Sequence, residues 1–544
     1  CKTLPALQPL FAQQGPVVHL TNAAGYAALS QTILSRVASG RLNKAISCGA
    51  ARPKIERLLA ISKLFAPFRR RDSLGAVILP DGTISSDREV MSLTLATHWG
   101  RAFEGSHTNA AHMESFLARN TTFVDASLLQ MPTLQDVHGA VRRGKNSAPG
   151  PDGIRASVWS RFSTVVSGAF FDAVTQLSNG TSGPGDLNDS IAVYIPKKGL
   201  HLGVHGLQAK ASEARPLALK NSSSKVLWRT LARAVTPALK TWAHVTQRGF
   251  VAGRVPGHGV IDVDTASRVV SVLHDLGVLS LYDFTSAFPS VSRSFILLVM
   301  QFSGFPAWSV SLTSASWAGA KIVDEQGQLL YWMSGGVGQG CPAAASAFVI
   351  GINPLLTALQ SELNVVGGET LSAFADDIAV VLTCASRLHV LHDISKEFEL
   401  ASALCLNFKK TVLAPLTSGC AVSAAATLRA AMVGTALADV CVAESAVLLG
   451  TPVGPRACHN ATTSQLGKYK VRCREIAALG LGPWAGHQLE KIIAAPGVHD
   501  GAQVFALGPR SPRLALVLMQ GLIRPPAPGS ITFWSRHFRT IVLP

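Results

Sequence analysis

Three aspartates in this chain have the type and spacing that could hold metal ions. Asp376 and Asp377 are adjacent inside the apolar stretch LSAFADDIAVVLT (371–383), and Asp283 is the next-to-last residue of the stretch GVLSLYDF (277–284). Carboxylates that meet repel one another unless a cation lies among them. Magnesium, or manganese in its place, suits such a site, because it takes hard oxygen ligands and completes its shell with phosphate oxygens. Two such ions would serve an in-line displacement at phosphorus.

The stretches around the acids predict the elements that must position them. LSAFA and IAVVLT are typical of two strands joined at Asp376 and Asp377, which places the acids at a hairpin turn. GVLSLYDF predicts a short buried strand, and if it lies beside the hairpin the three carboxylates meet at one sheet edge. A pair of aspartates at a turn is also an ordinary Asx-type turn without metal, so the pair alone leaves both interpretations open.

Strands and helices alternate through the middle of the chain and predict an α+β fold. SIAVYIPKKG (190–199) alternates as a strand does. TLQDVHGAVRRGKNSAPGPDGI (133–154) predicts a capped helix that ends in a Gly/Pro turn. Three later stretches have helical spacing. The three stretches are SSSKVLWRTLARAVTPALKTW (222–242), SRSFILLVMQF (292–302) and the run from GGVGQGCP (335–342) to Leu359.

The chain is basic, with 544 residues, a formal net charge of +17 and a pI near 9.7. Between residues 196 and 254 there are eleven Lys or Arg and one acid, Glu213. Such a balance favours a polyanionic partner, although a charge run is often only a solvated face.

Cysteine usage and hydropathy bear on the setting of the protein. The nine cysteines form no C-x-x-C pair, which predicts reduced thiols and an intracellular protein. No stretch reaches about 18 uninterrupted apolar residues, so we expect no membrane partner. The chain begins with Cys1, and we expect a fragment of a longer reading frame.

Nine short blocks occur in a fixed order along the chain. They are APGPDGI (148–154), IPKKG (195–199), RPLAL (215–219), QRGFVAGR (247–254), DFTSAF (283–288), GVGQGCP (336–342), FADD (374–377), LNFKKT (406–411) and LLGTPVG (448–454). In this order the blocks resemble the reverse transcriptase of non-LTR (LINE-type) retrotransposons, and more distantly that of group II introns. The finger block ARPLALKNSSSKVLW resembles the LINE-type form rather than the intron form. The resemblance covers roughly residues 130–460.

The resemblance implies a right-hand polymerase of fingers, palm and thumb, with an antiparallel palm sheet and a helical thumb. It implies an N-terminal extension of unknown role at 1–120, fingers and palm at 121–455, and a thumb or connection at 456–544. Asp283 matches the catalytic aspartate of the first palm motif, and Asp376 and Asp377 match the acidic pair of the third. Lys410 matches a lysine of the fourth motif that could protonate the leaving pyrophosphate; a surface lysine at a strand end is the alternative.

Substrate-binding residues follow from the same resemblance. Lys197 or Lys198, and Arg215, match the basic residues that grip the triphosphate, where an Arg fork suits phosphate oxygens. Phe288 falls where the family places an aromatic ring under the sugar, which would exclude a 2′ hydroxyl; a core Phe is the alternative.

The sixth block carries one departure from the family. Gln339 matches a glutamine near nucleotide and template, and Gly340 beside it would let the backbone approach closely. After this block the family has Leu-Ser-Pro, whereas this chain has three alanines from Ala343 to Ala345, which we expect to loosen the start of the following helix.

The implied partners are an RNA template, a DNA primer, their RNA–DNA heteroduplex and deoxynucleoside triphosphates, with no membrane and with no oligomeric state indicated. Nuclear residence is implied by the family and by no signal in the chain. The alternative is a decayed or repurposed nucleic-acid-binding protein derived from such an element. The presence of all three aspartates argues against it.

Overall fold

The computed structural model describes residues 11–14, 17–20, 74–105, 108–144, 147–197, 201–203, 206–457, 471 and 474. The chain divides into two compact units, one of Asp72–Ala457 and one of Cys1–Arg71 with Cys458–Pro544. In the latter, strands β1 (Phe11–Gln14) and β2 (Val17–Leu20) pair antiparallel. The expected thumb from residue 458 onward lies outside the described residues, apart from residues 471 and 474. The unit that begins at Asp72 includes residues 74–120 of the expected N-terminal extension.

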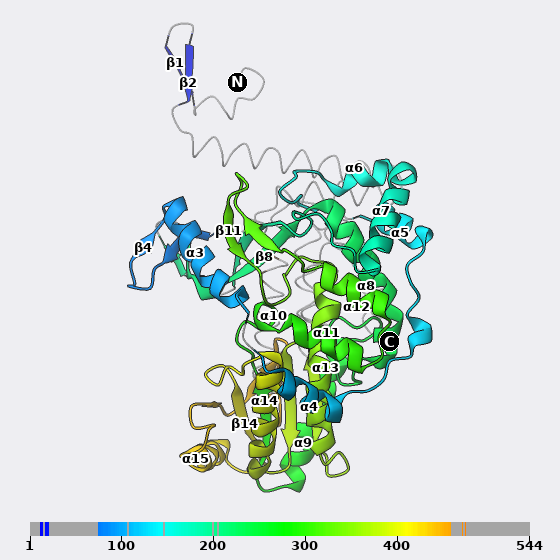
Figure 1. The fold of residues 1–544 in the computed structure, drawn as a ribbon. Helices are drawn as coiled ribbons and strands as arrows, with labels where there is room; N and C mark the ends of the chain where they lie inside the picture. Colours follow the sequence, from blue (N-terminus) through cyan, green and yellow to red (C-terminus); the bar gives the residue numbers. More distant parts are fainter. Residues whose placement is uncertain are drawn as a thin grey trace, which may run out of the picture. The chain divides into compact units, whose positions relative to one another are not determined.

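Helices make up much of the unit of residues 72–457 (Figure 1). They are α3 (Arg88–Phe103), α4 (Ala110–Asn120), α5 (Leu134–Arg142), α6 (Ala156–Arg161), α7 (Ser163–Ser178), α8 (Ser222–Trp242), α9 (Pro256–Leu273), α10 (Ala287–Ser290), α11 (Arg293–Phe302), α12 (Ala307–Ala315), α13 (Ala344–Glu362), α14 (Leu388–Ser402) and α15 (Ala421–Met432).

The strands of this unit form three larger sheets and one hairpin. The central sheet has the order β12 (Thr370–Phe374), β13 (Asp377–Leu382), β9 (Gly277–Tyr282), β14 (Val412–Leu416), β15 (Cys441–Val442). A second sheet has the order β11 (Leu329–Trp332), β10 (Lys321–Val323), β5 (Ser190–Pro196), β8 (Ala214–Lys220). A third has the order β4 (Ile84–Ser85), β3 (Leu74–Ile78), β7 (Gly206–Lys210), β6 (His201–Gly203), and β16 (Ala446–Leu448) pairs with β17 (Thr451–Val453).

The mixture of helices and several sheets confirms the α+β class. The central sheet is antiparallel from β12 to β14, as the resemblance implied, whereas the two-residue strand β15 pairs parallel with β14 at its edge. The capped helix begins where it was expected, because Thr133 and Asp136 form a reciprocal capping box at the start of α5. The strand 190–196 and the helices 222–242, 293–302 and 344–362 also lie where the pattern predicts them.

Both faces of the central sheet are buried, which explains why its strands are continuous apolar runs. Ile378, Val380 and Leu382 of β13 belong to the same apolar cluster as Phe348 of α13 and Phe398 of α14. The alternate residues of β13 point to the opposite face. Helix α9 packs against β12, β13 and β9.

Close contact between α9 and the sheet depends on a glycine. A Cβ on Gly277, the first residue of β9, would lie 2.2 Å from Cγ1 of Val270 in α9. No side chain fits in that space, so α9 lies directly on the strand that ends at Asp283.

Of the described helices, α13 alone has the length and composition to cross a membrane, with a mean hydropathy of 1.3 over its most apolar window. Within that window, 72% of the helix is buried inside the protein. It packs against α4, α8, α11 and α14, as the central helix of a folded core does. Its first residue is Ala344, and Ala343 before it is the N-cap residue, with no side-chain cap hydrogen bond. The looser helix start stays a prediction.

Candidate active site

The central sheet brings the three aspartates to one edge. Strands β13 and β9 are antiparallel, with Ile378 opposite Tyr282 as the last pair before the acids. Asp377 precedes Ile378 and Asp283 follows Tyr282, so continuing the register puts these two acids side by side. Asp376 lies in the two-residue turn of the β12–β13 hairpin, between the paired residues Phe374 and Asp377. The predicted hairpin and the predicted meeting of the strands are thus both present.

The loop 406–411, which precedes β14, holds Lys410 beside this edge of the sheet. Phe284 forms an isolated antiparallel bridge with Leu406, and the Asn407 N–H donates to the carbonyl oxygen of Asp283. The chain therefore follows the end of β9 before it turns into β14. Lys410 ends 3.7 Å from Asp283, measured from Nζ to Oδ2. That is an ion pair but too long for a hydrogen bond.

The acids disfavour one another's charge. Burial, followed by the neighbouring charges of Asp376 and Asp283, raises the pKa of Asp377 to about 6. Burial also raises the pKa of Asp376, and the charge of Asp283 adds to that shift. Arg215 counteracts both shifts in part. Burial and mutual repulsion thus both disfavour the charged forms of Asp376 and Asp377.

The donor set fits a divalent cation. Oδ2 of Asp283 is buried and accepts no hydrogen bond, which is costly for a carboxylate oxygen. Within the described residues, no group of three or more His, Cys, Asp or Glu side chains lies close enough together to hold a metal ion as it stands. Asp283 Oδ2 has only the 3.7 Å ion pair with Lys410, and carboxylate oxygens are ligands that Mg²⁺ or Mn²⁺ accepts.

Cations from the second sheet face the acids. Ile195 of β5 pairs with Arg215 of β8, and the Lys197 N–H donates to the Glu213 carbonyl. Burial lowers the pKa of Lys197, and the positive charges of Lys410 and Arg215 lower it further, whereas Asp283 raises it. These mutual effects put Lys197, Arg215 and Lys410 around one site with the acids. Lys198, the other candidate for the triphosphate, lies outside the described residues.

Phe288 belongs to an aromatic cluster beside the acids. Its ring stacks on that of Phe348, with centroids 4.4 Å apart and planes at 9°. The ring of Phe250 meets Phe288 edge to face at 6.2 Å and Phe374 at 5.8 Å. Phe250 is 54% exposed and has a left-handed backbone with φ of 59°, which is uncommon for a bulky residue. Phe288 is half-buried, so both its core packing and a contact with substrate are consistent with this position.

Gln339 and Gly340 lie against strand β8. The Ala218 N–H donates to the Gln339 carbonyl at 2.7 Å, and Leu217 forms a parallel bridge with Gln339. Gly340 has φ of 109°, and a Cβ there would lie 2.5 Å from the Ala218 carbonyl oxygen. Only glycine fits this approach, so the loop is fixed beside the strand that carries Arg215.

Six of the eleven cations in 196–254 are engaged within the protein. Arg248 pairs with Asp262, and the other five donate to main-chain carbonyls, Arg254 alone to those of four residues. The five are Lys197, Lys220, Lys225, Arg229 and Arg254. Much of the basic segment therefore holds loops and helix ends in place, and Lys210, Arg215, Arg233 and Lys240 remain as exposed cations among the described residues.

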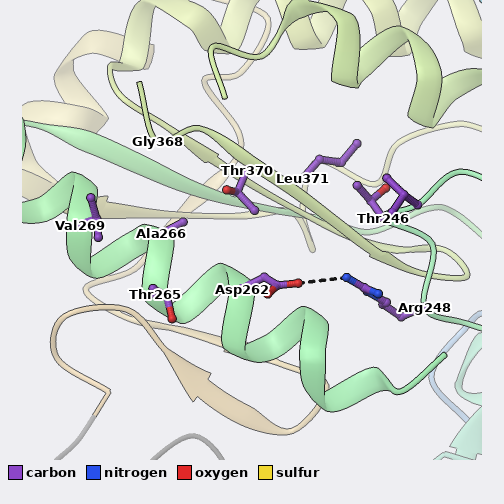
Figure 2. Close-up of a pocket in the computed structure, with 10 residues that line it drawn as sticks. Thr246, Arg248, Asp262, Thr265, Ala266, Val269, Gly368, Thr370 and Leu371 are labelled. Carbon is purple, nitrogen blue, oxygen red and sulfur yellow. Dashed lines mark hydrogen bonds and ion pairs between the residues drawn. The ribbon is translucent and has the colours of Figure 1, made fainter. Parts of the chain in front are cut away.

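A groove lies between α9, the start of β12 and the segment 245–248. Figure 2 shows Thr370 of β12 beside Ala266 and Val269 of α9, with the Arg248–Asp262 ion pair at one end. Its volume is about 420 Å³, and none of the three aspartates lines it. This groove is not the site of the chemistry.

Sequence reasoning missed two residues of this region, Gln247 and Phe250. Gln247 is fully buried and its side chain bonds to the turn that carries Asp376. Both residues lie in the block QRGFVAGR, which contributes to the resemblance. Local sequence pattern does not reveal that this glutamine is buried and this phenylalanine exposed.

Carboxylates at the ends of two neighbouring strands, facing lysine and arginine from another sheet, form a site that can hold a triphosphate over metal ions. Such a site is typical of nucleotidyltransferases. More specifically, residues 195–446 match the family described as reverse transcriptase (RNA-dependent DNA polymerase). This part of the chain is a reverse transcriptase domain, that of an RNA-directed DNA polymerase.

One curated relative bears on the subfamily. The chain is 24% identical over 301 residues to the Transposon TX1 uncharacterized 149 kDa protein of Xenopus laevis. The match covers 51% of this chain and 22% of that protein, so the chain spans about a fifth of its relative's length. Together with the domain match, this relative confirms the resemblance to non-LTR reverse transcriptases.

Proposed function

We propose that this protein extends a DNA 3′ hydroxyl on an RNA template with deoxynucleoside triphosphates and releases pyrophosphate. The reaction would serve the copying of a non-LTR retrotransposon, which takes place in the nucleus when the product enters a chromosome. The observation that carries the proposal is the buried Oδ2 of Asp283, which accepts no hydrogen bond and lies beside two further carboxylates with raised pKa values.

Each charged residue then has a role that fits its position. Asp283 and Asp376 would hold the divalent ions, with Asp377 as a weaker ligand. When bound, the ions would activate the primer hydroxyl and stabilise the leaving oxygen. Arg215 and Lys197 would bind the triphosphate, and Lys410 Nζ would donate a proton to the pyrophosphate as it leaves.

The aromatic cluster supports a deoxynucleotide as the substrate. Phe288 is clamped between Phe348 and Phe250, so its ring cannot swing away from an added 2′ hydroxyl. Gln339, fixed against β8, would lie between the nucleotide and the template base.

The test is incorporation of labelled dTTP on poly(rA) primed with oligo(dT), with Mg²⁺ or Mn²⁺. Wild type should extend the primer, and Asp376→Asn should abolish extension while template binding, measured by fluorescence anisotropy, stays nearly unchanged. Asp393→Asn is the matched control, because that carboxylate is 81% exposed and lies on α14. Polymerisation by Asp376→Asn at the wild-type rate would contradict the metal assignment. A folded wild type that binds template without extension would instead favour a decayed binding protein.

A further inference from the structure

The turn that carries Asp376 is braced by a neighbouring segment of the chain. The Ala373 N–H donates to the Thr246 carbonyl at 3.0 Å, and the Arg248 N–H donates to the Ala373 carbonyl at 2.6 Å. Residues 246–248 thus run parallel beside the end of β12, where the hairpin turns (Figure 2). This pairing places Gln247 at the turn.

The Gln247 side chain completes the hydrogen bonds of the turn. Its Oε1 accepts from the N–H groups of Ala375 and Gly249, each at 2.8 Å, and its Nε2 donates to the Ala375 carbonyl at 3.3 Å. Gln247 is 0% exposed, so these bonds form away from water. Buried main-chain groups without such partners would be costly, and here one side chain satisfies three of them.

The residue that Gln247 holds has an unfavourable backbone. Ala375 has φ of 56°, in the left-handed region, and is 2% exposed. For an alanine this conformation costs about 1–2 kcal/mol and persists only where the surroundings determine it. Gly249 packs so closely that a Cβ there would lie 2.5 Å from the Ala375 nitrogen. Ala375 therefore cannot relax without breaking the contact with Gln247.

We propose that Gln247 is a positioning residue, whose bonds to left-handed Ala375 fix the direction of the Asp376 carboxylate toward Asp283. The expected loss of kcat rests on the proposed function, because it requires that the protein is a polymerase. The expected loss of divalent-ion affinity at the acids does not require polymerase activity. Gln247 itself touches neither metal nor nucleotide.

The test replaces Gln247 by Met, which has a similar length and no hydrogen-bonding amide. We expect kcat to fall about 100-fold with the KM for dTTP changed less than about threefold, because the acid is displaced and the triphosphate site is not. We expect the affinity for Mn²⁺, titrated by electron paramagnetic resonance without nucleotide, to fall about 10-fold.

The matched control is Glu369→Met at the other end of the same hairpin. Glu369 is also 0% exposed, and its carboxylate accepts from the N–H groups of Asn364 and Thr383. The Glu369→Met substitution should lower the melting temperature but leave kcat and Mn²⁺ affinity unchanged. Equal losses of kcat and Mn²⁺ affinity in both variants would overturn the positioning role, as would a Gln247→Met protein with wild-type values.

Two further arms keep the outcomes distinct. If wild type extends no primer, the proposed function fails, and the Mn²⁺ titrations alone decide whether Gln247 positions the acid. If Gln247→Met does not fold, Gln247→Asn takes its place, because its amide is one methylene shorter and cannot make the same bonds to the Ala375 main chain. Weaker Mn²⁺ binding by a folded Gln247→Asn protein supports the inference, and unchanged binding overturns it.

Discussion

Asp377 links the chemistry of the site to the stability of the protein. Its pKa is raised to about 6 by burial and by two neighbouring acids, against an ordinary value of 3.8. The native state therefore favours the neutral form. The stability from that form is fully present below about pH 4 and is lost as the pH rises through about 6.

We predict that Asp377→Asn is more stable than wild type at pH 7.5 in the presence of a chelator, and that the difference disappears at pH 4. An amide does not ionise, so the variant avoids the repulsion that wild type acquires. Because the side chain is partly exposed, the gain at pH 7.5 should be only about 1 kcal/mol. Urea unfolding at the two pH values measures it. The same pH dependence in both proteins would show that Asp377 keeps its ordinary pKa.

At the scale of elements, the position of the acids depends on how closely α9 lies on the central sheet. We predict that Gly277→Ala destabilises the protein by about 1–3 kcal/mol, because the new methyl would overlap Val270 and force α9 away from β9. Denaturant unfolding measures the change. Primer extension should fall with it, since β9 ends at Asp283.

The control for that substitution is Gly168→Ala in α7. Gly168 is exposed within the helix, and a Cβ there meets no atom within 4 Å. Alanine is the better helix former, so this change should stabilise the protein by up to about 1 kcal/mol. If both substitutions destabilised equally, the steric explanation for Gly277 would be wrong.

The elements that the sequence predicted are those with strong local signals. The FADD hairpin and the strand before Asp283 are short apolar runs that end at the acids, and the helices over 222–242 and 293–302 have helical hydrophobic periodicity. The meeting of Asp283 with Asp376 and Asp377 was predicted only on the condition that two distant strands pair. The brace at Gln247 could not be predicted, because it depends on a parallel bridge between segments more than 120 residues apart, which leaves no periodic signal. The parallel pairing of β15 with β14 escaped prediction for the same reason, since β15 has only two residues.

For the molecule as a whole, the high positive charge is less available to a polyanion than its total indicates. Lysines and arginines that donate to internal carbonyls stabilise the fold. Those that remain exposed can contact phosphates. The two groups can be separated by mutation.

We predict that Arg233→Ala with Lys240→Ala weakens binding to single-stranded RNA and reduces the slope of log K against log salt by about 1–2, without a change in melting temperature. Arg254→Ala should lower the melting temperature and leave RNA binding and its salt dependence nearly unchanged. The Arg254 guanidinium donates to the carbonyls of four residues at the end of α8. Anisotropy titrations at several salt concentrations and thermal melts measure the two effects. A lower melting temperature for the double variant would place its side chains among the structural cations.

Helix α13 has a consequence for synthesis on the ribosome. Its 19 residues are translated before the hairpin and the helix α14 that cover it, which begin at Thr370 and Leu388. For a time the nascent chain therefore contains a segment as apolar as a membrane anchor while α14, one of its final neighbours, is not yet made. Chaperones at the tunnel exit, or slow translation after residue 362, would then decide how much of the protein reaches the folded state.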